Sequence, residues 1–355
     1  MNKNSPFYMS YAKGAKLSDI SEDRISWFVK RAKDEREYSF SKISNNRNML
    51  EQLTLQVEGG ISNAAIMLFG KYPQKFCPAA IVKCSYYLGT EVTRPIQSQQ
   101  NFEGTLFEQV DSATGFVLSK LDRTVGGREN STAAEVRLEI PKEAIREIIV
   151  NAVVHRDYDS NASVQIDVFA DRIEIINPGM LPKELTIRAL SKKHLSVPVN
   201  PFLARPFYLA GYINQLGYGT HNVVKWCRKA GLPDPDFISG DNQFTVTIWR
   251  NWLTDDRINQ LDLNDRQRAA ITFLKEHRKI SNPEYQKVAK AIKKTATRDL
   301  KDLVEKGVLE QRGTRGPGVH YILATNRDKM GTMGTSTSKT GNRDKTGTKG
   351  TSREK

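Results

Sequence analysis

The chain has 355 residues, of which 38% are hydrophobic and 26% charged, a composition typical of a globular protein with two or three domains. It contains no run of eighteen apolar residues, and its first residues lack the apolar core of a signal peptide, so the sequence predicts a cytoplasmic protein with no membrane partner. The net charge is +14, but residues 1–263 carry only +2, whereas residues 264–324 carry +7 and residues 325–355 carry +5, which favours a polyanionic partner for the C-terminal end.

The first 130 residues divide into two predicted segments. Residues 1–49 contain a helix that begins at a Ser cap and has acidic residues in its first turn. Residues 50–130 predict a connecting α+β domain with a helix before the Gly/Pro break at residues 70–73, a strand from Ala79 to Tyr87 and an amphipathic helix from Asn101 to Leu121.

Two common site motifs are missing from the sequence. The FGK stretch at Phe69–Lys71 has neither the preceding glycine nor the following Ser/Thr of a P-loop, so nothing supports a Walker-type helicase motor. The three cysteines form no CxxC pair, which argues against a zinc ribbon and a disulfide framework. We expect buried thiols at Cys77, Cys84 and Cys227.

Polar residues interrupt an apolar helical pattern after Pro141. The sequence KEAIREIIVNAVVH predicts a helix with a buried stripe of Ala and Ile residues. Glu147, Asn151 and His155 are four residues apart, about one helical turn, so they share one edge of this helix and could border a cleft. Alternatively, such an edge is only a solvated face, and His155 to Tyr158 could simply cap the helix and order the following turn.

Two strands and a loop follow this helix. Residues 163–170 and 172–176 alternate between apolar and polar and predict two strands joined by a tight turn. The second strand runs into Asn177-Pro178-Gly179-Met180-Leu181-Pro182, where Pro and Gly should end the strand pairing. Gly179 would let the backbone pass close to something flat, so a loop would face the helix edge.

A second glycine-containing loop begins another helix. Residues 185–207 contain Pro and basic residues between short helical pieces, as expected for a mobile lid. Lys192, Lys193 and His194 could either meet phosphate or form a solvated charge run. Gly217, Gly219 and Thr220 then precede a helix whose free backbone amides would favour an anion. Residues 243–252 alternate and predict the last strand of this region.

The C-terminal region predicts three short helices, over 265–276, 282–291 and 295–306, followed by a two-stranded Gly-rich turn. This order is that of a winged helix, in which the third helix enters the major groove of DNA. Winged helices also bind proteins, but the surplus of positive charge favours duplex DNA. The candidate DNA contacts on the third helix and the wing are Lys294, Thr295, Thr297, Arg298, Lys301, Arg312 and Arg315. Residues 325–355 hold a repeated NRDK motif and almost no apolar side chains, so we expect a disordered basic tail.

The motifs together resemble a known family. EAIREIIVNAVVHRDY, DRIEIINPGMLP, the stretch from Asn200 to Phe237 and the closing winged helix are similar to bacterial and archaeal ATP-binding transcriptional regulators, over about residues 50–323. Their ATP-binding domain is the GHKL type shared by gyrase, a heat-shock chaperone, histidine kinases and MutL. Residues 1–49 resemble only the last piece of the AlbA-like, Schlafen-type domain that members carry.

The resemblance implies a fold class and site roles. The fold would be α/β: a GHKL (Bergerat-type) ATP-binding α/β sandwich at 131–255, after the connecting domain at 50–130 and before a winged helix-turn-helix at 262–324. Glu147 would orient or deprotonate the attacking water and Asn151 would bind Mg²⁺, roles that suit phosphoryl transfer. The other residues implied to bind ATP are Asn177, Gly179, Gly217, Gly219 and Thr220.

Three departures from the family pattern leave alternatives open. Asn177 replaces an Asp that accepts from the adenine amino group, Leu181 replaces a second loop glycine, and Val199 replaces an Arg before Asn200-Pro201. We expect a homo-oligomeric regulator in which ATP modulates DNA binding or assembly, possessing at most weak Mg²⁺-dependent ATPase activity. The alternative is a DNA-binding or interaction scaffold with a vestigial, non-hydrolysing pocket. A histidine kinase is disfavoured because no phosphoacceptor helix precedes the Glu147 helix.

Overall fold

The chain divides into two compact units, which we describe separately. A computed structural model describes residues 6–41, 45–121, 123–125, 136–214, 218–250, 258, 261–277, 279–313 and 318–323. The N-terminal unit spans Met1–Asn264 and the C-terminal unit Asp265–Lys355. In the part of the chain that is described, no helix has the length and apolar character needed to cross a membrane.

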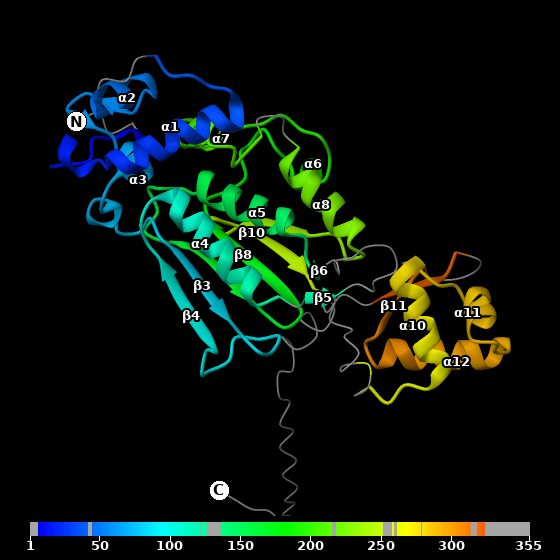
Figure 1. Ribbon diagram of the computed structural model, residues 1–355. Coiled ribbons are helices and arrows are strands. Elements are labelled where there is room, and N and C mark those ends of the chain that lie inside the picture. The colour runs from blue at the N-terminus through cyan, green and yellow to red at the C-terminus, as the bar shows by residue number, and fades with distance from the viewer. Residues whose placement is uncertain are drawn as a thin grey trace, which may run out of the picture. The chain divides into compact units, whose positions relative to one another are not determined.

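A six-stranded mixed sheet organises the N-terminal unit (Figure 1). Its strand order is β4-β3-β7-β8-β10-β9; β3 and β7 are parallel, and the other neighbouring pairs are antiparallel. The strands of this sheet are β3 (Val82–Tyr86), β4 (Ser98–Phe102), β7 (Val164–Val168), β8 (Arg172–Pro178), β9 (Asp236–Gly240) and β10 (Gln243–Trp249). Two small hairpins consist of β1 (Gln56–Val57) with β2 (Gly60–Ile61), and β5 (Arg123–Val125) with β6 (Val136–Leu138).

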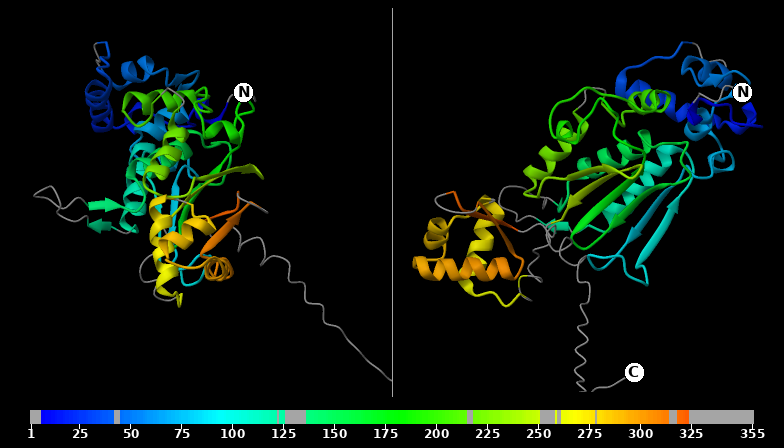
Figure 2. Two further views of the ribbon diagram at one scale, coloured as in Figure 1. Left: turned by 90° about the vertical axis from the view of Figure 1, so that its right-hand side faces the viewer. Right: turned by 180° about the vertical axis from the view of Figure 1, so that it is seen from behind.

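Helices cover one face of this sheet, and the view from behind shows the strands in front of them (Figure 2). Helix α5 packs against β8 and lies between α4 and α8. The helices of this unit are α1 (Glu22–Arg36), α2 (Asn46–Gln52), α3 (Asn63–Phe69), α4 (Leu106–Ser119), α5 (Lys142–Val154), α6 (Ile187–Leu190), α7 (Pro201–Leu209) and α8 (Gly219–Lys229). Short 3-10 turns occur at Phe7–Met9, Leu17–Asp19 and Pro73–Lys75. The fold is therefore a mixed α/β architecture with a two-layer core.

The buried stripe predicted for the helix after Pro141 is confirmed. The side chains of α5 that face the core are buried: Ala144, Ile145, Ile148, Ile149 and Ala152. Burying each large aliphatic side chain stabilises the fold by about 1.5–3 kcal/mol relative to exposure, so this stripe fixes the rotation of α5 about its axis. The polar edge of the helix is consequently held at one side of the core.

The pairing of β8 ends at Pro178, inside the predicted Pro/Gly stretch but two residues later than the predicted strand end at Ile176. β8 continues to Pro178 because β10 pairs with it there: Phe244 lies opposite Asn177, and Gln243 lies opposite Pro178. Pairing with β7 stops earlier, at Ile176. A proline lacks only the N–H donor, so a strand can carry proline where that donor is not needed.

Two further expectations for the first 130 residues needed correction. Residues 98–102, partly assigned to a helix, form the edge strand β4, and α4 begins only at Leu106 after the Thr105 capping box. The predicted strand at residues 79–87 is the shorter β3, which pairs with β7 in the central sheet. Segments on both sides of residue 130 therefore build one sheet.

The N-terminal residues pack into the same core. Ser21 caps α1, as predicted, by accepting from the Arg24 N–H at 3.4 Å. Phe28 is fully buried, and the Arg24 guanidinium donates to both carboxylate oxygens of Glu108 on α4, at 2.8 and 2.9 Å. The expectation of buried thiols is also confirmed, and burial raises the pKa of each of the three to about 12: Cys77, Cys84 and Cys227.

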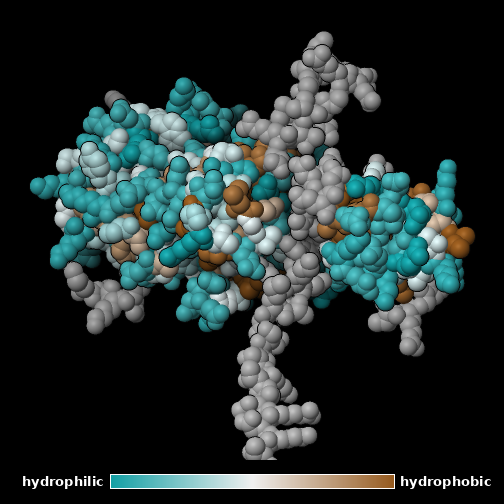
Figure 3. All heavy atoms as spheres, turned by 90° about the horizontal axis from the view of Figure 1, so that it is seen from below, coloured by the Kyte–Doolittle hydropathy of each residue, from teal (hydrophilic) through white to brown (hydrophobic). Residues whose placement is uncertain are grey.

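The C-terminal unit has the order helix, helix, helix, strand, strand. Its elements are α10 (Asp265–His277), α11 (Asn282–Val288), α12 (Lys293–Glu305), β11 (Leu309–Arg312) and β12 (His320–Leu323). The two strands are antiparallel, and Ile280 forms an isolated bridge to Tyr321. On the face drawn in Figure 3, hydrophilic residues cover most of the surface of both units.

Candidate functional site

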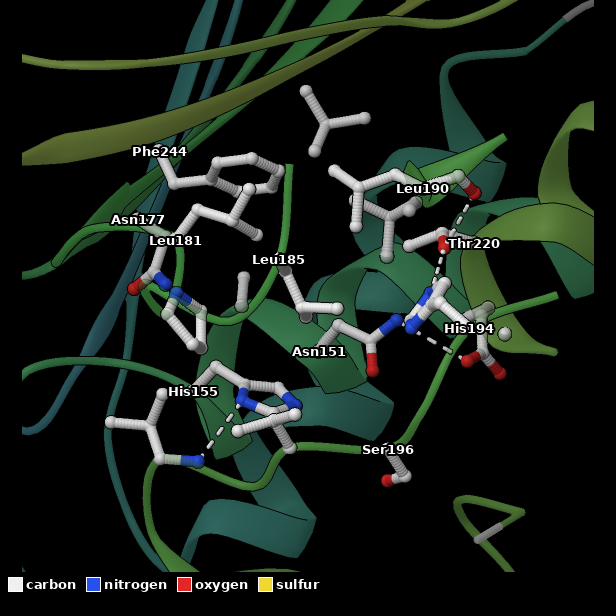
Figure 4. Close-up of a pocket in the computed structure, with 18 of the residues that line it drawn as sticks. Asn151, His155, Asn177, Leu181, Leu185, Leu190, His194, Ser196, Thr220 and Phe244 are labelled. Carbon is white, nitrogen blue, oxygen red and sulfur yellow. Dashed lines mark hydrogen bonds between the residues drawn. The ribbon is translucent and has the colours of Figure 1, made fainter. Parts of the chain in front are cut away.

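A pocket in the N-terminal unit lies beside the polar edge of α5. Its walls come from α5, the ends of β8 and β10, residues 180–199, the turn after α7 and the start of α8. Figure 4 shows one end of the pocket with Asn177, Leu181 and Phe244, and the other end with Leu190, His194 and Thr220. Asn151 and His155 lie between the two ends. The fold thus brings together groups that are up to about a hundred residues apart in the sequence.

Glu147 and Asn151 act as a pair at this edge. Asn151 Nδ2 donates to Glu147 Oε1 at 3.2 Å, so both predicted residues point into the same pocket. Burial raises the pKa of Glu147, although the bond from Asn151 and the neighbouring Arg146 charge oppose the rise. A carboxylate with a raised pKa is a better proton acceptor near neutral pH. Because Nδ2 is directed at Glu147, the Asn151 Oδ1 is left for another partner.

Gly219 allows the start of α8 to approach this pair. A Cβ atom at this position would overlap Glu147 Oε1 and would lie 3.6 Å from Asn151 Nδ2. Only glycine leaves the Glu147 carboxylate in its present place. Gly217, the other glycine predicted for this loop, lies outside the described residues.

Asn177 lies at the far end of the pocket, on β8. It is 5% exposed, and with its amide oriented to suit its neighbours, Nδ2 donates to the Ala152 carbonyl oxygen at 3.1 Å. This bond ties β8 to α5. It also leaves Oδ1 as the atom of the amide that can accept from a ligand.

Gly179 serves the backbone rather than the pocket lining. Its φ of 134° belongs to a region that is open essentially only to glycine, and a Cβ there would lie 3.2 Å from the Asp157 nitrogen. Next to it, the Asp157 N–H donates to the Pro178 carbonyl at 2.7 Å. The close approach in this structure is to the turn after α5, and the predicted contact of Gly179 with a flat ligand stays a prediction.

The turn after α5 is ordered by its own side chains, as in the alternative that residues 155–158 cap the helix and order the turn. Arg156 is 2% exposed and donates to the carbonyls of Ser160 and Ala162 at 2.8 and 2.7 Å. Tyr158 Oη donates to the Val153 carbonyl at 2.9 Å. These bonds satisfy polar groups that would otherwise be buried without partners.

His155 is a pocket residue that the sequence analysis did not commit to. Burial lowers the pKa of His155 to about 4, so the ring is neutral at pH 7. Its Nδ1 accepts from the Val199 N–H at 3.4 Å, which places the proton on Nε2. The ring lines the pocket and offers an N–H donor. The four-residue spacing from Asn151 was the signal that could have identified it.

The lid-like segment is bonded to the start of α8. Thr220 Oγ1 donates to the Leu190 carbonyl at 2.8 Å and lies 3.1 Å from His194 Nε2, and His221 Nδ1 lies 2.8 Å from the Ser191 carbonyl. His194 and Thr220 line the pocket. Lys192 and Lys193 are exposed and are not lining residues.

The lining is mostly apolar and contains few charged side chains. Among the described residues of the lining, Glu147 is the one acidic side chain and none is Lys or Arg. The apolar side chains include Leu181, which stands where a glycine would leave more space. For Mg²⁺, Asn151 Oδ1 is the amide oxygen beside Glu147, and one such oxygen fits an ion that keeps several waters and binds through ligand phosphates.

Most of the predicted DNA contacts are solvent-accessible on the C-terminal unit. The side chains of Arg298 and Lys301 are 76% and 77% exposed, and Lys301 Nζ lies 3.4 Å from Glu305. Lys294 is also exposed, whereas Thr295 is half-buried. Arg312 is exposed but pairs with Glu310, and Arg315 lies outside the described residues.

Thr297 and Asp299 are engaged in bonds within the C-terminal unit. Thr297 Oγ1 donates to the Lys293 carbonyl at 2.9 Å and accepts from Asn282 Nδ2 at 3.0 Å. Asp299 is buried and accepts from Tyr285 Oη at 3.1 Å and from Arg266 Nε at 2.8 Å. The polar groups between the helices therefore hold them together.

The sheet and the pocket define a mixed α/β protein with a candidate ligand site between a helix edge and the end of a strand. Residues 161–248 match the family described as "Putative ATP-dependent DNA helicase recG C-terminal". This match includes Asn177, Gly179 and the start of α8. Helix α5, with Glu147 and Asn151, precedes it.

The chain is also similar to a solved structure. It resembles the crystal structure of the DIP2311 protein from Corynebacterium diphtheriae, a structural-genomics target, with a TM-score of 0.54 and 17% sequence identity. The similarity covers 92% of this chain and 66% of that one, so the chain spans just under two thirds of the other protein. At this identity the likeness concerns the fold alone. No curated protein matches the sequence.

Proposed function

We propose that this protein binds ATP in the pocket of the N-terminal unit and duplex DNA through the C-terminal unit, as a regulator whose DNA binding or assembly responds to the nucleotide. The observation that carries the proposal is the meeting of the Glu147–Asn151 pair, the Asn177 amide and the start of α8 around one pocket, in a chain whose residues 161–248 match a family named for ATP dependence.

Each pocket group has a proposed task. Asn177 Oδ1 accepts from the adenine amino group, and the neutral His155 donates from Nε2 to the base or the sugar. The phosphates lie toward Gly219 and Thr220, where the free amides of a helix start favour anions. Asn151 holds Mg²⁺ through Oδ1, and the ion would neutralise phosphate charge. Glu147 orients or deprotonates the attacking water.

For the C-terminal unit we propose a winged helix. Three helices followed by an antiparallel strand pair are the elements of that motif, and α12 then lies in the major groove. Lys294, Arg298 and Lys301 lie on its exposed side, while Thr295, Thr297, Arg312 and Arg315 supply further contacts. The basic excess of this end supports attraction to phosphates.

The same pocket supports a second candidate function, a scaffold that binds a nucleotide without hydrolysing it or has lost the nucleotide. The described lining has no Lys or Arg to neutralise a triphosphate, and Leu181 narrows the pocket at the adenine end. A helicase is not proposed, because the FGK stretch only closes α3: the Gly70 N–H donates to the Ile66 carbonyl at 2.8 Å.

A calorimetric titration of the full chain with ATP and Mg²⁺ tests the proposal. We expect saturable binding that Asn177→Leu weakens strongly, because leucine has no acceptor for the adenine amino group. GTP, with an acceptor in place of that amino group, should bind more weakly. No heat of binding for ATP with the wild type would favour the scaffold. DNA binding measured with and without ATP then tests whether the nucleotide regulates it.

A further inference from the structure

One wall of the pocket is a turn that α1 holds from outside. This turn, residues 208–214, consists of the last two residues of α7 and the five residues after it, and Ile213 and Asn214 line the pocket. Arg36, in the last turn of α1, donates from Nε to the Tyr208 carbonyl at 3.0 Å. Its Nη2 donates to the Ile213 carbonyl at 2.8 Å and to Asn214 Oδ1 at 2.9 Å. A single guanidinium thus binds both pocket residues of the turn.

Other residues in the last two turns of α1 also contact residues 208–214. Arg31 Nε donates to the Ala210 carbonyl at 3.1 Å, and the Arg36 guanidinium lies 4.5 Å from the centre of the Tyr208 ring. Gly211 has a φ of 75°, and a Cβ there would lie 2.6 Å from Glu35 Oε2. The carbonyls that end a helix lack partners within it, and cationic side chains satisfy them well.

The inner side of the turn is attached to the catalytic helix of the proposal. Tyr212 is buried; its Oη donates to Asp111 Oδ2 at 2.7 Å, and Arg146 lies 4.5 Å from its ring centre. Arg146 is the neighbour of Glu147. The turn is therefore fixed between α1 on one side and α4 and α5 on the other.

The first residues of the chain also reach a second wall. Tyr8 Oη donates to the Val199 carbonyl at 3.4 Å, and the Val199 N–H donates to His155 Nδ1. The N-terminal residues thus contact the backbone of two separate pocket walls.

We infer that the N-terminal segment, through Arg36, is a positioning element of the pocket: it holds residues 208–214 so that Ile213 and Asn214 keep the place a ligand requires. This inference rests on the proposed nucleotide site. Arg36 does not line the pocket, so it acts through the turn. Anything that moves α1, such as a bound partner, would then change ligand affinity from outside the pocket.

Full-length Arg36→Gln and Lys33→Gln variants test this inference. Both remove one positive charge from α1, but Lys33 is exposed, with no side-chain bond among the described residues. Hydrogen exchange across residues 208–214, the Kd for ATP with Mg²⁺ and the Tm are measured for each. We expect faster exchange confined to the turn and about tenfold weaker ATP binding in Arg36→Gln. Lys33→Gln should match the wild type, and Arg36→Lys should recover part of the affinity, because an ammonium cannot span three acceptors.

The outcomes separate the two proposals. Unchanged exchange in Arg36→Gln, or faster exchange with wild-type ATP affinity, would overturn the positioning role. A lower Tm with exchange raised across the whole unit would also overturn it, because Arg36 would then be only structural. If the wild type binds no ATP, the proposed function fails, whereas exchange raised only at residues 208–214 would still support the hold of α1 on the turn.

Discussion

The two units place their polar side chains in opposite ways. In the N-terminal unit the candidate groups face inward and bond to each other or to backbone, as Glu147 does with Asn151 and Asn177 with Ala152. In the C-terminal unit the buried polar groups hold the helices together, and cations such as Arg298 extend into solvent. The first arrangement suits a small ligand that fits fixed groups. The second arrangement suits a long polyanion, because exposed cationic side chains can adapt their conformation to it.

The largest expected effect concerns the inward-facing unit. Glu147→Gln keeps the size of the side chain but removes the proton acceptor, so ATP hydrolysis should fall by about 10²–10⁴-fold while binding remains. Phosphate release at saturating ATP measures this. Wild-type turnover should also be lost as the pH falls through the raised pKa of Glu147, because the protonated acid cannot accept a proton. A wild type without turnover would contradict the catalytic role and favour the non-hydrolysing pocket.

Gly179→Ala tests whether the backbone conformation at Gly179 stabilises the end of the pocket at which we propose that adenine binds. The substitution should lower the free energy of unfolding of the N-terminal unit by about 1–3 kcal/mol, because the added Cβ is strained at this positive φ and lies close to the Asp157 nitrogen. Denaturant unfolding measures the loss, with Gly240→Ala as control, since a Cβ there meets nothing within 4 Å. Equal stability of the two variants would argue against the backbone role.

In the outward-facing unit, Arg298→Ala should weaken binding to a preferred DNA sequence by about 1–3 kcal/mol and to random DNA much less. Fluorescence anisotropy with both duplexes measures the difference. Lys287→Ala is the matched control, because Lys287 is an exposed cation on α11 and is not among the proposed DNA contacts. Equal weakening on all sequences would make Arg298 a phosphate contact, and no binding by the wild type at low salt would remove the DNA proposal.

The smallest expected effect is a pH dependence from His155. Its pKa is about 4 in the folded chain and about 6.5 when unfolded, so below pH 6.5 the unfolded state takes up more protons. The N-terminal unit should lose roughly 1–2 kcal/mol of stability as the pH falls from 6.5 to 4.5. His155→Gln should flatten this part of the pH profile relative to the wild type. An unchanged slope in His155→Gln would mean that folding does not shift the pKa of the His155 ring.

Local patterns predicted the parts of this molecule that depend on neighbours in the sequence. The buried stripe of α5 and the Ser21 cap of α1 follow from helical spacing and from one side chain, and both are confirmed. The shared edge of Glu147 and Asn151 followed in the same way, and their side chains meet.

The features that failed depend on distant segments. β4 has a polar sequence because it is an edge strand, so periodicity gave no strand signal. The neighbour of Gly179 is the turn after α5, and the meeting of His194 with Thr220 joins residues 26 apart. No spacing rule within one helix or strand predicts such contacts, and the hold of Arg36 on Asn214 spans 178 residues.

The parallel pairing of β3 with β7 limits where the chain can be divided. A fragment that begins at residue 131, the predicted start of the ATP-binding domain, would lack β3, β4 and α4. β7 would become a bare edge with unpaired backbone groups beside uncovered apolar side chains, and such edges recruit other chains. Recombinant work on the pocket therefore needs the first 121 residues. Without them the isolated fragment would aggregate, and this aggregation would be mistaken for natural self-association.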